Sequence, residues 1–546
     1  MLTHTRSISE TIFEVWRSPG RFTKNPDLIL LPSGRLMLVY CDTDQHWSIK
    51  DQYLILLVSD DRGKSWSKFK EVDKADLSKG DARLVTPRLS RLDDGRLVIL
   101  IDNDDFGNFH EDQPSGIWAY WSEDEGETWS KPQNTGILGY EPDRMLTLPD
   151  GRLGVATQYM LGESQEYGMF LYCSDDAGAS WYKQGVIAHD GYNCHSEGAL
   201  VFLDGGKELA CVMRQDQSAG NPSYVVFSKD GGKQWSTPQM CPFSFHRPYA
   251  KRLPDGRVLV TGRNANGGLG TYAWCGDLKR ELGHHIGGPR RKFAAELTND
   301  ALVIENLPDH ECKYSLLPPQ SSRSEVLMEA NVKVDGPKGG ALAFMSVSKL
   351  VCIPAHGSLP VPRIGEGAAV VLFIGSDWVG LNFNDANQGK QVDMTRYRKL
   401  TIHHKRGLLQ IRVDGETIVN NCVFGEDIRI TDSHAHDLTK RTMFGGFGEN
   451  GRSSWKNVTY DVKNPTLNDH SWKFDAADGR WPNQYQRDRL IQIHGNHPDQ
   501  QPWPDHGYSS WVVLDDGKIM FVDYTNCGDV PKTSHLVGTF IDPEKL

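Results

Sequence analysis

Short apolar stretches recur along the chain, and many pairs of them are joined by a turn that contains glycine. Six of these pairs share one pattern, in which an apolar stretch, a glycine-containing hairpin turn and a second apolar stretch follow each other. The six hairpins begin at Leu31, Leu92, Leu148, Leu203, Leu253 and Leu514. A third apolar stretch follows each of the first four. The pattern therefore predicts a repeated unit of four antiparallel strands and about 50 to 60 residues.

A second repeat follows the third strand of the first four units. Its sequences are SDDRGKSW at 59–66, SEDEGETW at 122–129, SDDAGASW at 174–181 and SKDGGKQW at 228–235. The aspartate can accept hydrogen bonds from N–H groups of the turn, and the glycine supplies a left-handed backbone conformation. The tryptophan is expected to wedge between neighbouring units. These turns are predicted to hold the fold together and to do no chemistry.

A four-stranded unit at this period is typical of a propeller blade, so the sequence predicts an all-β fold with a six-bladed β-propeller. The hairpin glycines are evenly spaced from Gly34 to Gly256, and the next is Gly517. Strand-like segments fill this interval and predict a β-sandwich inserted between blades five and six. The expected domains are blades one to five at 1–282, the sandwich at 283–468, and a connector with blade six at 469–546.

Composition removes several classes of function. The net charge is −11 and no Lys/Arg run occurs, so a nucleic acid partner is not expected. No apolar stretch is long enough to span a membrane. The N-terminus lacks secretory features and the ten cysteines are scattered, which favours a cytoplasmic protein, or a secreted or periplasmic one whose signal peptide has been removed. His and Cys spacings indicate no metal site, and no cofactor is expected.

Ionisable residues gather just before or just after the hairpins, where blade ends of a propeller meet around one funnel. Burying unpaired charges at such a place is costly, so their concentration indicates an active site. Arg214, Arg247 and Arg263 lie in units four and five, and guanidinium groups hold carboxylates well. The expected ligand is therefore an acidic sugar. The other candidate binding residues are Arg88, Glu141, His195, His246 and His506.

The four repeated turns within six hairpins resemble the Asp-boxes (BNR repeats) of the sialidase, or neuraminidase, superfamily, over roughly residues 20–280 and 500–546. HSEG before a hairpin that ends in MR resembles the glutamate and arginine of that family, which gives Glu197 and Arg214. GYSSWVVLDDG resembles the blade that carries the nucleophilic tyrosine, which gives Tyr508. The resemblance implies an exo-glycosidase that removes a terminal acidic sugar. Tyr508 is then the nucleophile, Glu197 the base that takes its proton, Asp44 the acid and Arg263 the third arginine.

The chain also departs from this family. FTKNPDL stands where sialidases carry the first arginine, so either Arg21 or Lys24 replaces it, or the site is not built for sialic acid. Three histidines at the starts of blades four, five and six favour a lyase that acts on uronates by β-elimination. A third possibility pairs Glu141 with Glu197 as acid and nucleophile, as in sialidase-fold exo-arabinanases.

A non-catalytic, glycan-binding propeller is the remaining alternative. The segment LTIHHKRGLLQIRVDGETI of the insert resembles laminin-G and concanavalin-like lectin domains. This resemblance implies that the insert binds sugar, and a role in packing alone is the other interpretation. In each of these hypotheses the partner is a carbohydrate.

Overall fold

The computed structural model describes most of the chain. The described residues are 6–104, 116–161, 166–189, 193–215, 221–289, 293–495 and 504–546. Within 293–495 they leave out 309, 311, 321–322, 337–338, 348–349, 355–359, 365–367, 382–388, 424–441 and 449. Among these residues the fold is all-β, as predicted, with one short helix, α2 (Gln484–Arg489), and five single 3-10 turns. Within these ranges no helix has the length and apolar character needed to cross a membrane.

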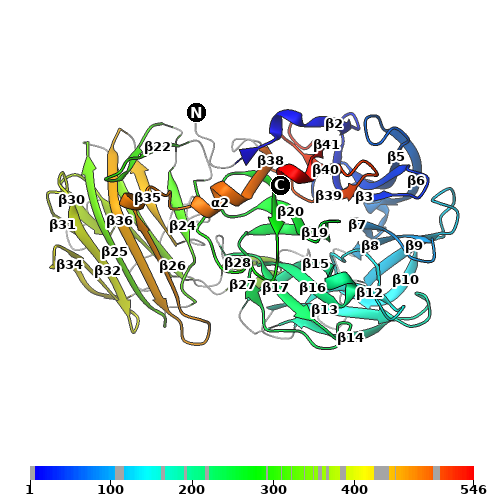
Figure 1. Cartoon of the computed structure of the whole chain (residues 1–546), viewed down its shortest axis with the longest axis horizontal. Helices are drawn as coiled ribbons and strands as arrows, with labels where there is room; N and C mark the ends of the chain where they lie inside the picture. The colour runs from blue at the N-terminus through cyan, green and yellow to red at the C-terminus, as the bar shows by residue number, and fades with distance from the viewer. Residues whose placement is uncertain are drawn as a thin grey trace.

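Six small antiparallel sheets make up the larger part of the molecule, on the right in Figure 1. Sheet one has β3 (Phe22–Leu30), β4 (Leu36–Thr43), β5 (Asp51–Ser59) and β6 (Ser67–Asp76). Sheet two has β7 (Arg83–Arg91), β8 (Leu97–Asp104), β9 (Gly116–Ser122) and β10 (Gln133–Leu138). Sheet three has β11 (Leu146–Thr147), β12 (Leu153–Leu161), β13 (Glu166–Ser174) and β14 (Tyr182–Ala188). Sheet four has β15 (His195–Leu203), β16 (Glu208–Gln215), β17 (Tyr224–Ser228) and β18 (Gln239–Met240).

Sheets five and six each take a strand from a distant part of the sequence. Sheet five has β19 (Phe245–Arg252), β20 (Val258–Asn264), β21 (Gly270–Gly276) and β38 (Leu490–Gly495), with β1 (Arg6–Ser7) at its edge. Sheet six has β39 (Ser510–Val513), β40 (Ile519–Thr525), β41 (His535–Ile541) and β2 (Phe13–Trp16). The stretch 469–546 was expected to hold a connector and blade six, but its strand β38 pairs with β21. The inserted segment therefore interrupts sheet five before its fourth long strand.

Apolar packing links the six sheets in sequence order. Six buried clusters each draw on two sheets: one with two, two with three, three with four, four with five, five with six, and six with one. Burial of apolar side chains is the main favourable term in folding. Because every small sheet has one face in each of two clusters, none of them has an independent core.

The four repeated turns have one hydrogen-bond pattern. In the third, the Ser174 hydroxyl donates to Asp176 (2.7 Å), and Asp176 accepts the N–H of Ser180 (2.8 Å). The Trp181 indole N–H donates to the carbonyl of Gly178 (3.2 Å). The four tryptophans, Trp66, Trp129, Trp181 and Trp235, each pack against a cluster shared by two neighbouring sheets. The predicted structural role of these turns agrees with this geometry.

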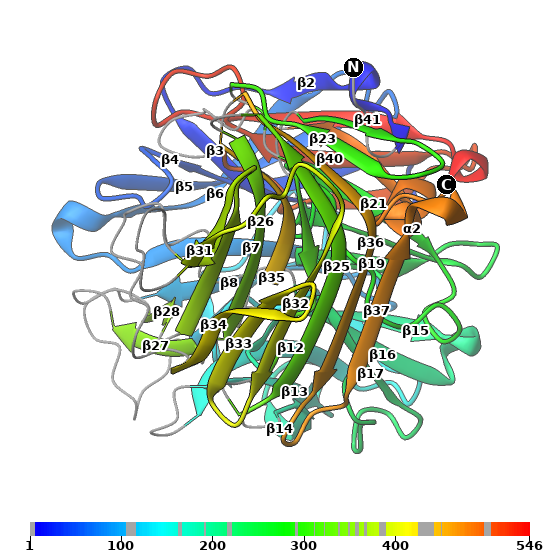
Figure 2. The same ribbon diagram turned by 90° about the vertical axis from the view of Figure 1, so that its left-hand side faces the viewer.

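The inserted segment forms two larger sheets, on the left in Figure 1. One contains β22 (Ala294–Leu297), β23 (Leu302–Glu305), β25 (Glu325–Asp335), β32 (Arg398–Lys405), β33 (Leu408–Val413), β34 (Glu416–Val423), β36 (Arg452–Lys463) and β37 (His470–Asp475), and Figure 2 faces it. The other contains β24 (Lys313–Leu316), β26 (Gly339–Val347), β29 (Ala368–Ile374), β30 (Trp378–Leu381), β31 (Gly389–Gln391) and β35 (Thr442–Gly448). A hairpin of β27 (Leu350–Pro354) and β28 (Pro360–Ile364) stands apart.

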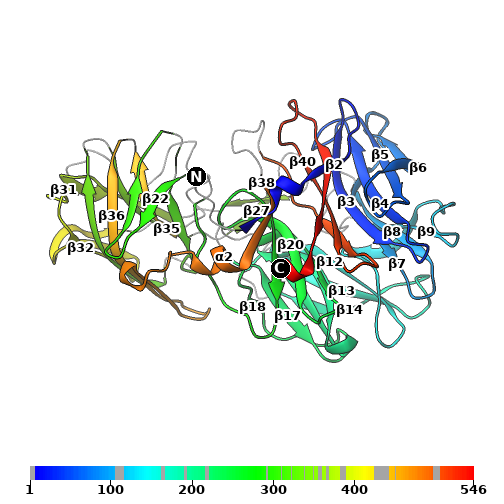
Figure 3. The ribbon, with the colours of Figure 1, turned by 45° about the horizontal axis from the view of Figure 1, so that its top comes forward.

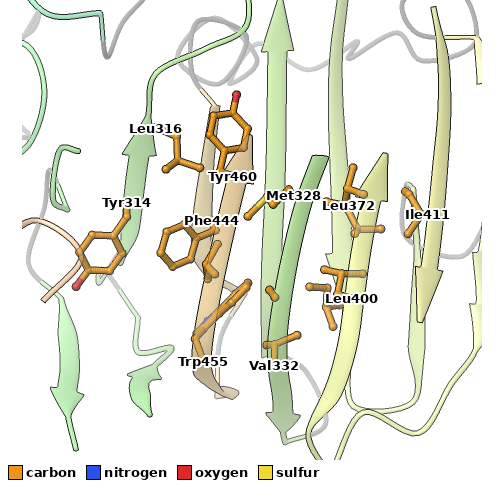
Figure 4. Close-up of a cluster of buried hydrophobic side chains, with 14 of the residues drawn as sticks. Tyr314, Leu316, Met328, Val332, Leu372, Leu400, Ile411, Phe444, Trp455 and Tyr460 are labelled. Carbon is orange, nitrogen blue, oxygen red and sulfur yellow. The ribbon is translucent and has the colours of Figure 1, made fainter. Parts of the chain in front are cut away.

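One apolar core joins these two larger sheets, which we call the two-sheet unit. It includes Trp455 and Leu400 from one sheet and Phe444 and Leu372 from the other, all fully buried or nearly so (Figure 4). Helix α2 lies between this unit and sheet five, next to β38 (Figure 3). The Trp274 indole N–H of β21 donates to the hydroxyl of Tyr485 in α2 (3.1 Å). The unit is thus fixed to the sheet that it interrupts.

A pair of glycines tests the packing of the repeated turns. Gly178 (φ 96°) and Gly151 (φ 87°) both have left-handed backbones, but a Cβ on Gly178 would lie 2.9 Å from the Trp121 ring, whereas one on Gly151 would meet nothing within 4 Å. We expect Gly151→Ala to lower the free energy of unfolding by about 1–2 kcal/mol from backbone strain alone, and Gly178→Ala to lower it further. Urea unfolding of both variants measures the difference. Equal losses would contradict the tight packing of this turn.

Candidate active site

One residue near the start of each small sheet has a left-handed backbone conformation. Five of the six are not glycine, although this conformation costs such a residue about 1–3 kcal/mol. They are Asn25 (φ 55°), Thr86 (φ 48°), Glu141 (φ 51°), Glu197 (φ 45°), Arg247 (φ 49°) and Gly507 (φ 97°). In sheets one, two, four and five the strand register shifts here. Because a bulge of this kind re-aims a side chain, six residues leave their sheets at equivalent places.

Glu197 is the centre of the contacts among these residues. Its Oε1 accepts hydrogen bonds from the Tyr508 hydroxyl (2.7 Å) and from Nη1 of Arg214 (2.8 Å). Its Oε2 accepts the backbone N–H of Arg247 (2.7 Å). The side chain of Glu197 is buried, while that of Arg214 is 22% exposed. The structure thus brings together Tyr508, Glu197 and Arg214, which the sequence had placed in one site.

Glu141 is the second carboxyl group beside Tyr508. Its Oε1 lies 3.4 Å from the Tyr508 hydroxyl oxygen, and its Oε2 accepts a hydrogen bond from Nε2 of Gln158 (3.0 Å). Its backbone N–H donates to Oδ1 of the buried Asp102 (2.7 Å). Two carboxyl groups therefore flank one phenolic hydroxyl. Two carboxyl groups that contact the same hydroxyl repel each other when both are ionised, which pushes their pKa values apart.

The protonation states follow from burial and from the arginines. Burial and the Glu197 charge raise the pKa of Glu141 to about 8. Burial acts on Glu197 as well, but Arg214 and Arg247 outweigh it and hold the pKa of Glu197 well below its usual range. Burial and the two carboxyl groups raise the pKa of Tyr508 well above its usual value. At neutral pH the site therefore holds a protonated Glu141, an ionised Glu197 and a neutral Tyr508.

The three predicted arginines are not equivalent. Arg247 is only 2% exposed, and its guanidinium donates to the carbonyls of Glu141 (3.3 Å) and Pro142 (3.2 Å) below the Tyr508 ring. Arg214 and Arg263 have side chains that are 22% and 28% exposed. The prediction that Arg247 contacts a substrate carboxylate therefore conflicts with its burial. Its position suits it to support Glu141 and Tyr508 instead.

Arg263 belongs to a polar group on the other side of Tyr508. Its guanidinium donates to Asp505 (3.0 Å) and to the carbonyl of His506 (2.6 Å), and it lies 5.9 Å from the centre of the Tyr508 ring. Asp505 also accepts the Tyr524 hydroxyl (2.6 Å) and approaches Nδ1 of His46 (2.5 Å). A hollow of about 220 Å³, lined in part by Asp505, His46 and the half-exposed Trp47, adjoins this group.

Asp44, the predicted acid, accepts hydrogen bonds within its own loop. Its carboxylate accepts the Ser48 hydroxyl and the N–H groups of Ile49 (3.2 Å) and Lys50 (3.4 Å). These contacts are those of a residue that shapes a loop, and none of them reaches Tyr508 or Glu197. Of the two candidate substitutes for the first arginine, Arg21 is paired with Asp42 (2.5 Å) and Asp51 (2.8 Å), and Lys24 donates to the His46 carbonyl (2.6 Å).

The three histidines have different surroundings. His195 is fully buried and packs edge-on against Tyr224, with ring centroids 5.5 Å apart. His506 is buried, with its Nδ1 3.2 Å from the Thr271 hydroxyl. His246 is partly exposed and lies close enough to Glu197 to lower the pKa of that carboxyl group. His246 therefore has an electrostatic effect on the candidate site.

Arg88 is buried among the small sheets, near enough to Arg247 for the two charges to repel each other. Its side chain is 5% exposed, and its guanidinium lies 4.0 Å from Asp27 and 5.7 Å from the centre of the Tyr249 ring. Burial lowers the pKa of Arg88. The predicted contact of Arg88 with substrate therefore does not fit its position, because the residue is enclosed by the small sheets.

Sequence reasoning missed Gln158, which forms hydrogen bonds with both Glu197 and Glu141. Its Oε1 accepts the backbone N–H of Glu197, and its Nε2 donates to the carboxyl group of Glu141. Gln158 faces Tyr140 across the third sheet just as Arg214 faces Ser196 and Arg263 faces His246. The signal was this repeat position. Gln158 carries no charge, so the concentration of ionisable residues did not point to it. No group of His, Cys, Asp or Glu suited to a metal ion occurs in the part of the chain that the structure describes.

One known family model matches the part of the chain that contains most of these repeats. Residues 73–319 match the family model of the BNR repeat-like domain. This region is similar to BNR repeat-like domains. The match includes Glu141, Glu197, Arg214 and Arg247, and it confirms the resemblance to the BNR superfamily drawn from the repeated turns. No curated protein sequence matches the chain.

Solved structures similar to this chain include three glycosidases and one protein of unknown function. The protein of unknown function, from Dyadobacter fermentans, has 18% identity and a TM-score of 0.43, with 58% of this chain and 96% of that one covered. The Penicillium chrysogenum alpha-L-arabinanase has 16% identity and a TM-score of 0.39, with 56% and 97% covered. The Hadza microbial sialidase Hz136 has 18% identity and a TM-score of 0.38, with 47% and 56% covered. Trypanosoma rangeli sialidase has 13% identity and a TM-score of 0.34, with 85% and 96% covered.

The raised pKa of Glu141 predicts a pH-dependent stability. The pKa moves from 4.5 to about 8 on folding, so the native state holds this proton between these values while the unfolded state has released it. Its contribution is complete below the unfolded pKa and is lost as the pH rises through the folded pKa. We expect Glu141→Gln to make the fall in unfolding free energy between these pH values smaller. It will not abolish the fall, because burial also raises the pKa of Asp102, to about 7.

Urea unfolding at several pH values measures this change. Asp176→Asn is a suitable control, because the pKa of Asp176 is lowered to about 2, so this residue does not titrate between pH 4.5 and 8. If Glu141→Gln left the pH dependence of the wild type unchanged, Glu141 would not be the partly buried, protonated acid described above.

Proposed function

We propose that this protein is a glycoside hydrolase that removes a terminal, acidic sugar from glycans. In this proposal the six small sheets are the blades of a six-bladed propeller and the two-sheet unit is a β-sandwich inserted into the fifth blade. The six apolar clusters, which link the sheets in order from one back to one, support the ring. The equivalent left-handed residues support six repeated blades whose ends point to one funnel.

The observation that carries the proposal is the Tyr508–Glu197 hydrogen bond of 2.7 Å. Tyr508 is partly buried, and a tyrosine whose hydroxyl donates to an ionised carboxylate is an activated nucleophile. In the first step the Tyr508 oxygen bonds to the anomeric carbon and its proton passes to Glu197. The glycosidic C–O bond breaks, and the leaving oxygen takes a proton from an acid. Water then hydrolyses the tyrosyl–sugar bond, and Tyr508 regains its proton.

Glu141 is the better-placed acid in this scheme. It holds a proton at neutral pH because burial and Glu197 raise its pKa to about 8. Its Oε1 is 3.4 Å from the Tyr508 hydroxyl, so it lies beside the proposed nucleophile and reaches the leaving oxygen only if the substrate binds with that oxygen on the Glu141 side. Asp44, the acid implied by the family resemblance, stays a prediction, and its carboxylate would have to leave the hydrogen bonds of its own loop.

An acidic sugar fits the partly exposed guanidinium groups of Arg214 and Arg263 on the two sides of Tyr508. Arg214 is bound to Glu197 in the free site. A substrate carboxylate that takes Arg214 away from Glu197 would raise the pKa of Glu197 and make it a stronger base for the tyrosine proton. Substrate binding would in this way activate the nucleophile.

A second candidate function is an exo-glycosidase with two catalytic carboxyl groups, in which Glu141 is the acid and Glu197 the nucleophile. The opposite pKa shifts of these residues favour it, because an acid and an ionised nucleophile are the pair that such enzymes need. In this scheme Tyr508 orients Glu197 and forms no bond to the sugar.

Substitution of Tyr508 tests the proposal. The purified protein is incubated with nitrophenyl glycosides of sialic acid, glucuronic acid, galacturonic acid and arabinofuranose, and released nitrophenol is followed. We expect turnover of an acidic glycoside, and a loss in kcat of at least about 100-fold in both Tyr508→Phe and Glu197→Gln. Tyr182→Phe is the matched control, since the Tyr182 hydroxyl contacts Arg152 and Asp175 on the surface.

Other outcomes separate the alternatives. If only Glu197→Gln and Glu141→Gln lose turnover, the two-carboxylate scheme replaces the tyrosine scheme. A product that carries a new carbon–carbon double bond, detected by mass and ultraviolet absorbance, would make the protein a lyase. Absence of turnover on every glycoside and on uronate polymers would overturn the proposal of an enzyme.

A further inference from the structure

A cavity of about 660 Å³ lies between sheet four and the two-sheet unit, outside the candidate active site. One wall comes from the edge of sheet four, around Tyr224 and Gln239. The opposite wall comes from two segments of the two-sheet unit, 317–320 and 464–470. In Figure 3, β18, which carries Gln239, is drawn on the side of sheet four nearest the two-sheet unit. The size falls within the range of small-ligand sites, about 300–1,000 Å³.

Among the described residues, the lining mixes polar and apolar side chains and carries no acidic or basic chain of the Asp, Glu, Lys or Arg type. Six of its residues have side-chain amides: Asn193, Asn221, Gln239, Gln320, Asn464 and Asn468. An amide both donates and accepts hydrogen bonds, as does a sugar hydroxyl. Leu317, Pro318 and Pro319 add an apolar surface of the kind that covers the C–H face of a sugar ring.

The walls of the cavity are held in place before any ligand binds. The Gln320 N–H donates to Asn464 Oδ1 (3.0 Å), and Gln320 Oε1 accepts the N–H groups of Thr466 (3.1 Å) and Leu467 (3.0 Å). The Gly283 N–H donates to the Met240 carbonyl (2.8 Å), which ties the start of the insert to sheet four. A preformed site of this kind loses less entropy when it binds.

We propose that this cavity binds a neutral oligosaccharide. The cavity also adjoins the strand that carries Glu197, since Asn193 precedes β15 by two residues and the Tyr224 ring packs against His195. The inference goes beyond the proposed function and does not depend on turnover. It gives the insert a part in glycan recognition through a cleft that only the insert and sheet four together enclose.

Binding to the full-length protein tests this inference. The probes are lactose, N,N′-diacetylchitobiose, xylotriose and arabinotriose, each measured by ligand-observed NMR in a Tyr508→Phe background that removes hydrolysis. Gln239→Trp places a large ring in the cavity mouth. Gln133→Trp is the matched control, because both glutamines are exposed first residues of outermost strands, β18 and β10. Asn468→Trp repeats the test from the opposite wall, should Gln239→Trp fail to fold.

We expect at least one probe to bind, Gln239→Trp or Asn468→Trp to raise its Kd at least tenfold, and Gln133→Trp to leave it unchanged. Galacturonate, which the two partly exposed arginines would attract, should not displace the probe. The inference is overturned if no probe binds, if binding survives both cavity substitutions, or if galacturonate competes with every probe. Loss of turnover in Tyr508→Phe with unchanged probe binding would support the proposed function separately, so the two hypotheses fail independently.

Discussion

The left-handed residue in each small sheet is the constraint on which the candidate site depends. In a regular strand the side chains around Glu197 and Arg247 would point alternately to the two faces of their sheets, where apolar clusters lie. The bulge points each of these side chains in a different direction. The strand pairing on both sides compensates the energetic cost of the strained backbone. Only in sheet six is the residue a glycine, Gly507, and there the next residue is Tyr508. A Cβ on Gly507 would lie 2.4 Å from Cβ of Arg263, so the close approach of these strands requires glycine.

The charges of the site are balanced through shared partners. Glu197 takes hydrogen bonds from a side-chain guanidinium, a backbone N–H and a phenol, which together keep a buried carboxylate ionised. Glu141 has the weaker set, a side-chain amide and a guanidinium at 3.9 Å, and it stays protonated. Glu141 and Glu197 thus occupy equivalent positions in adjacent sheets but have opposite protonation states. Their difference comes from the second strand, which supplies Gln158 in one sheet and Arg214 in the next.

Sequence patterns predicted the hairpins, the repeated turns, the insertion and the meeting of Tyr508 with Glu197 and Arg214. These features are encoded locally, in turns and in the alternation of apolar residues. Pairing of β38 with β21 and of β2 with β41 could not be read in this way, since about 200 residues and almost the whole chain separate these strands. Burial of Arg247 and Arg88, and the loop contacts of Asp44, depend on which side chains surround them. Residue type alone does not carry that information.

The existing partners of the arginines determine which of them can bind the carboxylate of an acidic substrate. Arg247 is enclosed, Arg21 is paired with two aspartates, and Arg263 shares its charge with Asp505. Arg214 is the guanidinium with both partial exposure and a direct bond to the proposed base. A substrate carboxylate can therefore gain a strong partner only in competition with Glu197. Selectivity for acidic sugars and activation of the nucleophile would then be one event, and a neutral sugar that fits the same funnel would leave Glu197 too weakly basic to take the tyrosine proton.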